Sequence, residues 1–223
     1  VASSVARALG AGRNDEARRL VPQALLIATV LALLFTALLL GLGRQLFTAM
    51  GGSGAALEAA LAYSNVLFAG ALAIWVPTIL SAVVRGTGNM VLPSLLLSGT
   101  AIIHLGLCPL LVFGWGPLQG LGVAGAAIST LSTSLLSGGV LVVHLLRGKG
   151  PLRLRGTAWV LHPALLRTIL RVGVPASISP VLSNGAIAAA TALIGSYGTA
   201  ALAGYGVAAR LEYIMVPIAF GFG

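Results

Sequence analysis

Two charged residues lie within an apolar stretch near the end of the chain. Arg210 and Glu212 fall in the run from Ala200 to Gly223, which is otherwise uncharged. A charge at the centre of a membrane helix costs about 2.5–3.5 kcal/mol on insertion scales, so each needs a partner, water or a polar cavity. Residues two positions apart point about 200° apart around a helix, so they cannot pair well with each other. They indicate one of two arrangements. The first is a polar lock, in which these side chains bond polar groups of neighbouring helices, and the second is a cavity in which Glu212 exchanges protons or meets a cationic substrate.

A second pair of reactive side chains occurs in the middle of another apolar stretch. His104 and Cys108 are four residues apart and share one helical face, and Pro109 lacks the backbone donor that would bond the carbonyl of Leu105. Imidazole and thiol are poor ligands for a hard cation such as Na⁺ compared with oxygen groups. An imidazole can instead carry a proton at physiological pH. His104 is therefore a candidate for proton coupling, and the alternative is a neutral side chain bonded to a neighbouring helix.

Other polar side chains in the apolar stretches give weaker indications. Asn184, one turn after Pro180, is the best of them. Hydroxyls are frequent in two stretches, as Ser177, Ser179 and Ser183 and as Ser129, Thr130, Ser132 and Thr133. We expect most of these hydroxyls to bond backbone carbonyls of their own helix. Four side chains either form a wall for flat cations or simply pack: Tyr63, Asn65, Phe68 and Trp75.

Six apolar stretches carry these residues. They run from Val21 to Gly43, Ala59 to Val84, Met90 to Phe113, Leu121 to Leu146, Val172 to Tyr197 and Ala200 to Gly223. A helix needs about 20 residues to cross the ~30 Å hydrocarbon layer, so each stretch is long enough. Pro77 in the second stretch, and Pro175 with Pro180 in the fifth, should bend their helices. The chain is therefore predicted to be an all-α, polytopic membrane protein with six crossings of the lipid bilayer.

Basic residues are confined to alternate breaks between these stretches. Of the 13 Lys and Arg residues, 11 lie before the first stretch, between the second and third, or between the fourth and fifth. They are Arg7, Arg13, Arg18, Arg19, Arg85, Arg147, Lys149, Arg153, Arg155, Arg167 and Arg171. Short cytoplasmic loops retain Lys and Arg. The residues before Val21 and the 147–171 segment are therefore predicted to lie on the cytoplasmic side of the inner membrane.

The connections divide the chain into three parts. Gly41 to Gly54 is a Gly-rich break, Arg85 to Asn89 a tight turn and Gly114 to Gly120 a short turn at the interface. Arg147 to Pro163 is longer, with the glycines and charges of a linker, and His162 to Arg171 has the pattern of a short helix on the membrane surface. The predicted parts are a first-lobe fragment with four membrane helices (1–146), a cytoplasmic linker with the surface helix (147–171) and the start of a second lobe (172–223).

Composition excludes several other classes of protein. Hydrophobic residues make up 58% of the chain and charged residues 8%, with a mean hydropathy of +1.03, whereas a soluble domain has roughly 25% charged residues. The basic residues behind the formal charge of +9 are explained by the predicted orientation of the helices in the membrane. No basic face interleaved with aromatic residues suggests a nucleic-acid partner. The single cysteine excludes an intrachain disulfide, and no Cys or His spacing suggests a metal site. No Ser/His/Asp set, HExxH motif or paired aspartates occur within the stretches, so an enzyme is not expected.

One sequence match points misleadingly to a nucleotide cofactor. Gly120-Leu-Gly-Val-Ala-Gly125 fits the pattern GxGxxG, but dinucleotide binding requires a preceding strand and a βαβ unit. Here the pattern opens a membrane helix. Small residues let membrane helices approach closely, and we assign this role to Gly122, Gly125, Ala126 and Ser129. No cofactor is expected.

Six short motifs occur in a fixed order along the chain. They are Gly10-Ala-Gly-Arg-Asn-Asp-Glu-Ala17, Arg85-Gly-Thr-Gly-Asn89 with Pro93, Pro109-Leu-Leu-Val-Phe-Gly114, Gly120-Leu-Gly-Val-Ala-Gly-Ala-Ala-Ile128, Gly173-Val-Pro-Ala176 and Gly198-Thr-Ala-Ala-Leu-Ala203. Together they closely resemble the multidrug and toxic compound extrusion (MATE) transporters, and the resemblance covers nearly the whole chain.

The resemblance implies a monomeric antiporter with two six-helix lobes in an inverted V, which exchanges small organic cations, such as drugs, for H⁺ or Na⁺ by alternating access. This chain would hold the third to eighth of twelve helices, without the first two and last four. In many relatives the positions of His104 and Cys108 resemble an Asn and an Asp that bind cations, and both are changed here. The alternative is a flippase for lipid-linked precursors or polysaccharides, which shares the helical frame but requires a strongly cationic cavity.

Overall fold

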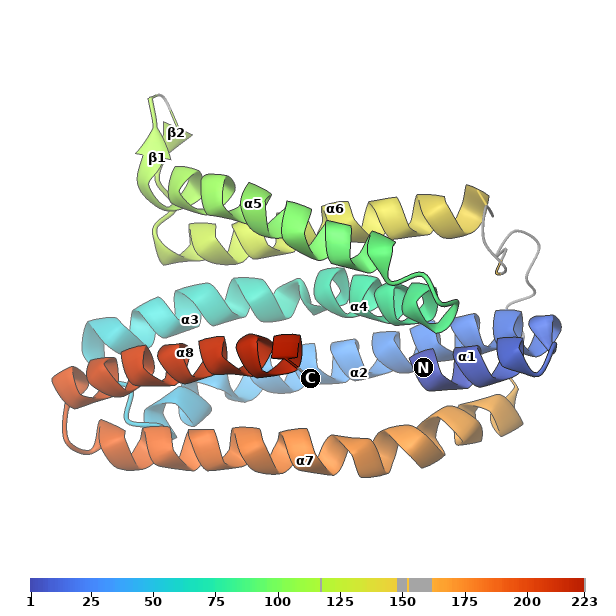
Figure 1. Cartoon of the computed structure of the whole chain (residues 1–223). Coiled ribbons are helices and arrows are strands. Elements are labelled where there is room, and N and C mark those ends of the chain that lie inside the picture. The colour runs from blue at the N-terminus through green and yellow to red at the C-terminus, as the bar shows by residue number, and fades with distance from the viewer. Residues whose placement is uncertain (117, 148–151, 153–161, 223) are drawn as a thin grey trace. The chain divides into compact units, whose positions relative to one another are not determined.

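The computed structural model of the chain describes residues 1–116, 118–147, 152 and 162–222, and the side chains of residues 118 and 212–222 lie outside this description. The described residues form eight helices and one short β-hairpin (Figure 1). The helices are α1 (Ala2–Gly10), α2 (Asn14–Ala49), α3 (Gly54–Ala69), α4 (Ala71–Gly86), α5 (Val91–Phe113), α6 (Val123–Arg147), α7 (Pro163–Gly195) and α8 (Thr199–Phe222). The predicted all-α class is confirmed.

All six predicted stretches are helical. Four of the helices, α2, α5, α6 and α7, are long and apolar enough to cross a membrane. The α3 and α4 helices pass the same test as a pair, with an angle of 54° between them. The sixth stretch is α8, a helix of 24 residues. The number of crossings remains a prediction.

The described chain divides into two compact units. The first unit contains Val1–Gly41 and Ala62–Pro175, and the second contains Leu42–Leu61 and Ala176–Gly223. The α7 helix therefore contributes its first part to one unit and its remainder to the other. The linker predicted between Arg147 and Pro163 lies mostly outside the described residues, so the predicted division into three parts remains a prediction.

The core of the first unit lies where α1, α2, α4, α6 and the start of α7 meet. Its most deeply buried side chains include Val21, Val83 and Leu141. Gly86 ends α4 at this point, and a Cβ there would lie 2.8 Å from the carbonyl oxygen of Ala2 in α1. The missing side chain thus allows α1 to pack directly on α4.

The basic helix ends lie together at one end of the first unit. Figure 1 shows the starts of α2 and α7 and the ends of α4 and α6 at that end. Arg18, Arg85, Arg147 and Arg167 belong to these segments. The arrangement agrees with the positive-charge rule from which the topology was predicted. The side of the membrane on which this end lies remains a prediction.

Two helix boundaries differ from those expected. The Gly-rich break from Gly41 to Gly54 is helical as far as Ala49, so the turn is confined to residues 50–53. A glycine inside a helix costs only about 1 kcal/mol relative to alanine, and the leucines around Gly41 are good helix formers. The residues expected to form a separate surface helix are instead the first turns of α7, which runs on to Gly195.

The marked bend in the second stretch lies at Gly70, seven residues before Pro77. A Cβ at Gly70 would lie 2.4 Å from Cδ1 of Leu131, so α6 occupies the space beside the bend. Pro77 is buried inside α4, where its ring packs on Gly138. A glycine therefore lies at each of these two contacts with α6, and the chain bends at Gly70, which has no side chain.

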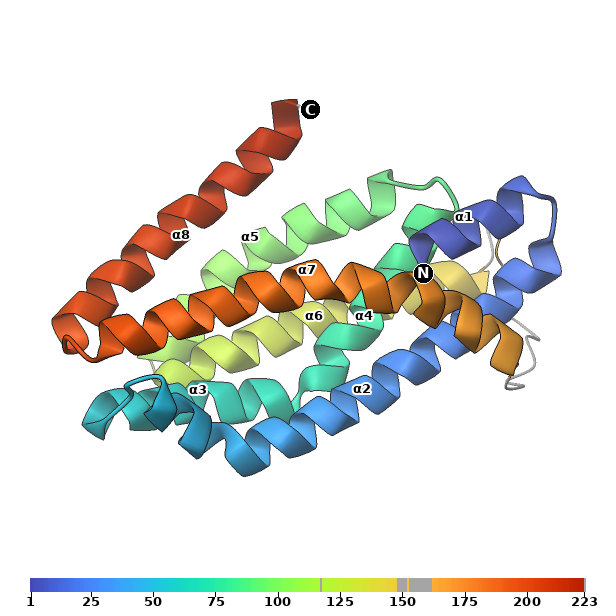
Figure 2. The ribbon, with the colours of Figure 1, turned by 90° about the horizontal axis from the view of Figure 1, so that it is seen from below.

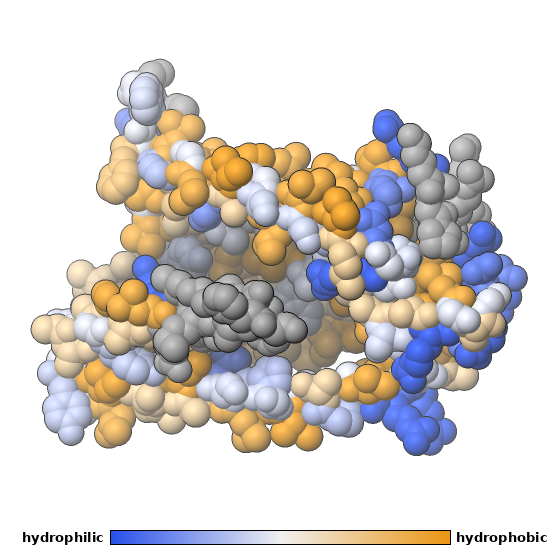
Figure 3. Space-filling model, in the orientation of Figure 1, coloured by the Kyte–Doolittle hydropathy of each residue, from blue (hydrophilic) through white to orange (hydrophobic). Residues whose placement is uncertain are grey.

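Large apolar side chains are exposed along α5. Leu97, Ile102 and Leu105 each expose more than 70% of their surface, and Figure 3 shows hydrophobic residues over much of the visible face of this helix. Contiguous apolar surface of this extent is rare on a soluble monomer. In a bilayer the same side chains meet acyl chains, as expected of a membrane helix.

Candidate functional site

A close contact between α5 and α6 positions the first candidate residue. Figures 1 and 2 show the two helices side by side and antiparallel, joined by the hairpin of β1 (Gly114–Trp115) and β2 (Leu118–Gln119). A Cβ at Gly125 would lie 2.4 Å from the carbonyl oxygen of Leu111. The predicted use of a small residue for close helix approach is therefore confirmed at Gly125.

The other glycines of the GxGxxG pattern also have roles in this turn. A Cβ at Gly120 would lie 2.6 Å from the carbonyl oxygen of Val112, and Gly122 has a φ of +58°. The Leu121 N–H donates to the carbonyl of Leu111 at 2.8 Å, and the Gly122 N–H donates to that of Val112 at 3.1 Å. These bonds satisfy carbonyls that a helix end leaves unpaired. The pattern therefore closes a helical hairpin.

His104 forms a hydrogen bond between the two helices. Its Nδ1 lies 2.9 Å from the Ser129 hydroxyl of α6. Ser129 is fully buried, whereas His104 is half-buried. The Thr133 hydroxyl donates to the Ser129 carbonyl at 3.0 Å, so the serine is held on both its side-chain and backbone oxygens. The interhelical bond that we weighed as an alternative for His104 is present.

This bond is compatible with two protonation states of the imidazole. When Nδ1 is unprotonated, the Ser129 hydroxyl can donate to it. When the ring is an imidazolium, Nδ1–H can donate to the hydroxyl oxygen instead. The bond between His104 and Ser129 can therefore form with the ring in either state.

Cys108 lies one turn beyond His104 on the same helix. Its thiol is reduced and half-buried. Pro109 follows it within α5, so the carbonyl of Leu105 lacks its usual helical donor. Cys108 and this carbonyl are polar groups of α5 within about one turn of His104.

The remaining candidates belong to the second unit. The Asn184 side-chain amide donates to the carbonyl of Pro180 at 2.8 Å, so this amide is used by its own helix. Arg210 is exposed, and it has no ion pair among the residues whose side chains are described. The Glu212 side chain lies outside the described residues. The structure therefore brings His104 and Cys108 together with Ser129 in one unit and places Asn184, Arg210 and Glu212 in the other.

Two aromatic rings of the first unit pack against each other. The rings of Trp75 and Phe35 have centroids 5.6 Å apart at an angle of 41°. Nearby, the Thr36 hydroxyl donates to the carbonyl of Phe68 at 2.7 Å. These contacts join α2 to α3 and α4 and show the packing role expected as one alternative for Trp75.

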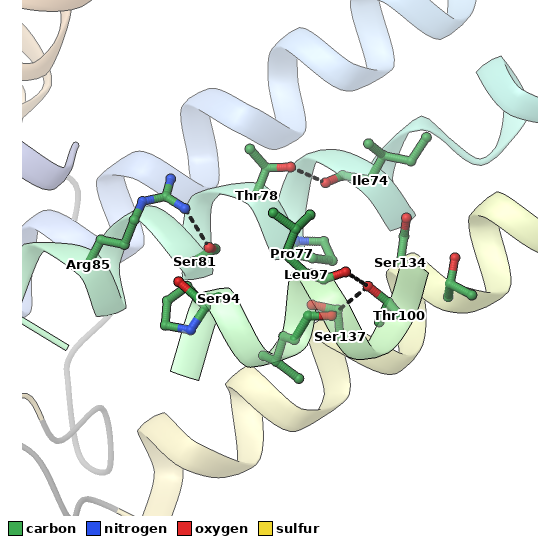
Figure 4. A pocket seen from close by; sticks show the side chains of 13 residues that line it. Ile74, Pro77, Thr78, Ser81, Arg85, Ser94, Leu97, Thr100, Ser134 and Ser137 are labelled. Atoms are coloured by element: carbon green, nitrogen blue, oxygen red, sulfur yellow. Dashed lines mark hydrogen bonds between the residues drawn. The ribbon is translucent and has the colours of Figure 1, made fainter. Parts of the chain in front are cut away.

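A polar pocket between α4, α5 and α6 was not predicted from the sequence. The pocket has a volume of about 350 Å³, and Figure 4 shows Arg85 at one end of it, with Thr100 and Ser134 toward the other. Seven hydroxyls line it: Thr78, Ser81, Ser94, Thr100, Thr133, Ser134 and Ser137. Spacings of three and four residues, as in Thr78-Ser81-Arg85 and Thr133-Ser137, were the available signal, since they align side chains on one helical face.

Comparison with known proteins identifies the family. The MatE family model matches residues 1–110. A solved structure described as the inward-facing conformation of a multidrug resistance MATE family transporter has 26% sequence identity and a TM-score of 0.75, over 86% of this chain and 42% of that one. Residues 1–110 therefore belong to the MATE family, and the rest of the chain is similar to its members. The chain's relatives are transporters, which confirms the prediction that the chain is not an enzyme.

Two named relatives are similar along nearly the whole chain. A probable multidrug resistance protein from Bacillus subtilis is 28% identical over 96% of this chain and 47% of its own length. An FAD transporter from Shewanella oneidensis is 27% identical over 98% of this chain and 48% of its own length. The chain thus spans about half the length of these relatives.

Proposed function

We propose that the complete protein is a secondary antiporter that exports organic cations across the cytoplasmic membrane in exchange for H⁺ by alternating access. Similarity to the MATE family carries this proposal, because several relatives are named as multidrug resistance proteins. Two features of the first unit support H⁺ over Na⁺. The His104–Ser129 bond accommodates a proton, and α5 and α6 contain no carboxylate that would offer Na⁺ a charged oxygen ligand.

The coupling ion is tested in proteoliposomes that contain the complete transporter. A fluorescent organic cation is followed under an imposed pH gradient and, separately, under an imposed Na⁺ gradient. Movement driven by the pH gradient alone is the expected result. Movement driven by Na⁺ would show that His104 and Cys108 are not the coupling site.

The His104→Gln variant tests the imidazole directly. Glutamine can still bond the Ser129 hydroxyl but cannot take up a proton, so we expect transport driven by the pH gradient to fall more than about tenfold. His144→Gln, near the end of α6, is the matched control and should transport at the normal rate. Transport by His104→Gln at the rate of the control would reduce His104 to a structural role.

A second substrate class follows from one relative. The Shewanella oneidensis protein is named an FAD transporter, and FAD carries a pyrophosphate in place of a cationic group. The same liposomes are therefore loaded with FAD in a parallel experiment. Failure of both the organic cation and FAD to move under either gradient would favour the flippase alternative.

A further inference from the structure

Arg85 places an uncompensated positive charge in the pocket between α4, α5 and α6. It is the one charged side chain among the described residues that line this pocket. No acidic side chain in the described part of the chain forms an ion pair with it. Its guanidinium donates to the Ser81 hydroxyl at 2.8 Å, and a guanidinium has further N–H donors in a planar fork. The pocket therefore repels a cation and offers donors to an anion.

Four of the pocket's hydroxyls already donate a hydrogen bond and can only accept from a ligand, and three have a proton left to donate. Those of Thr78, Ser94, Thr100 and Thr133 donate to backbone carbonyls of their own helices at 2.6–3.0 Å. Their lone pairs remain to accept hydrogen bonds. The hydroxyls of Ser134 and Ser137 form no hydrogen bond within the described residues, and Ser81 keeps its proton while accepting from Arg85. The pocket thus offers three free hydroxyl donors and a row of acceptors.

A phosphate with neighbouring hydroxyls matches this arrangement. Guanidinium groups bind phosphate through two parallel charge-assisted bonds, and the Ser81 hydroxyl beside Arg85 can donate to a further phosphate oxygen. The free hydroxyls of Ser134 and Ser137 line the same pocket and can bond the rest of the ligand. The ligand's own hydroxyls can donate to the threonine oxygens deeper in the pocket. Ile74 and Arg85 both line the pocket and are roughly 16 Å apart along α4 at 1.5 Å per residue, so more than an inorganic phosphate fits.

We propose that this pocket is a binding site for a glycerol phosphate group, with the phosphate on Arg85 and the glycerol hydroxyls toward Thr100. This binding site goes beyond the transport function proposed above. Its occupancy can be measured without an ion gradient. The same chemistry occurs in a soluble phosphate monoester and in the head group of phosphatidylglycerol. Arg85 belongs to the end of α4, so its end of the pocket lies toward the basic end of the first unit (Figures 1 and 4).

Binding is tested on the complete transporter. Isothermal titration calorimetry of glycerol 3-phosphate against protein in an uncharged detergent measures the soluble source. Native mass spectrometry of protein from nanodiscs of phosphatidylglycerol mixed with phosphatidylcholine measures the lipid source. We expect saturable binding of glycerol 3-phosphate, or selective retention of phosphatidylglycerol, and whichever is observed identifies the source.

Variants of pocket residues distinguish binding at this site from a general attraction of anions to the basic end of the first unit. Arg85→Gln should weaken binding about 10- to 100-fold, the effect of losing hydrogen bonds to a charged group. Arg7→Gln removes the same charge from an exposed position on α1 and should leave binding unchanged. Ser137→Ala keeps every charge and should weaken binding by a smaller factor, which provides a second variant if Arg85→Gln does not fold.

Two results would overturn the proposal. One is binding of glycerol 3-phosphate and phosphatidylglycerol no tighter than that of glycerol and phosphatidylcholine. The other is an equal loss for Arg85→Gln and Arg7→Gln, which would indicate attraction of anions by the basic end as a whole. Neither result depends on transport, so failure of this site is distinguishable from failure of the antiporter proposal.

Discussion

Gly125→Ala should destabilise the protein by about 3 kcal/mol, at the upper end of the range for overpacking. A Cβ at this position would lie 2.4 Å from the carbonyl oxygen and 2.6 Å from the carbonyl carbon of Leu111. Both are backbone atoms, so a rotamer change cannot relieve the overlap, and α5 and α6 must separate. Separation would also lengthen the His104–Ser129 bond. The measurement is the apparent melting temperature of the complete transporter in detergent.

The matched control is Gly139→Ala in the same helix. No atom outside its own helix lies within 4 Å of the Cβ position there, and alanine has the higher helix propensity. Gly139→Ala should therefore leave the melting temperature unchanged or raise it slightly. Equal melting temperatures for the two variants would mean that the close approach of α5 and α6 does not exist in the complete protein.

Glu212→Gln should reduce transport to the background of protein-free liposomes. α8 begins at Thr199, which places Arg210 roughly 16 Å and Glu212 roughly 20 Å along the helix at 1.5 Å per residue. Ionisable residues at such a depth face a bundle interior or a water-filled cavity and mark ion or substrate paths. Glutamine keeps the size of the side chain and removes its charge and its exchangeable proton. The measurement is uptake driven by the pH gradient, with expression checked in parallel.

Glu58→Gln is the control for loss of a carboxylate. Glu58 forms an exposed ion pair with Arg44 at 2.8 Å, and such pairs contribute about 0–1 kcal/mol. We therefore expect Glu58→Gln to transport and fold normally. If Glu212→Gln transports normally but melts at a lower temperature, Glu212 belongs to a polar lock between helices; undiminished transport with normal stability would remove it from both roles.

Much of the fold could be predicted from local patterns. Each apolar stretch is helical because a segment in lipid must satisfy its own backbone hydrogen bonds, and a helix does so within the segment. The observed helix boundaries differ from the predicted ones where the sequence pattern indicated a break. Gly41 lies inside α2, and residues 163–171 lie inside α7, because neighbouring residues with good helix propensity override a single glycine or a charged turn.

The candidate site was only partly visible in the sequence. Spacing placed His104 and Cys108 on one face, because helical periodicity relates residues of the same segment. It could not identify Ser129 as the partner of His104, since that requires the register between two helices. The polar pocket was not predicted for the same reason: its hydroxyls come from three helices, and the sequence does not give the register between them.

The sequence by itself therefore determined the apolar helical segments, the helix ends at which positive charge gathers and the family resemblance, because hydropathy, charge and short motifs are properties of contiguous residues. Only the tertiary structure decided which polar groups meet. The contact of Gly125 with the Leu111 backbone brings His104 to Ser129, and the packing of α4 and α5 on α6 places Arg85 in one pocket with the free hydroxyls of Ser134 and Ser137. Both outcomes depend on how closely helix backbones approach and how the helices are rotated, and distant residues jointly set these quantities.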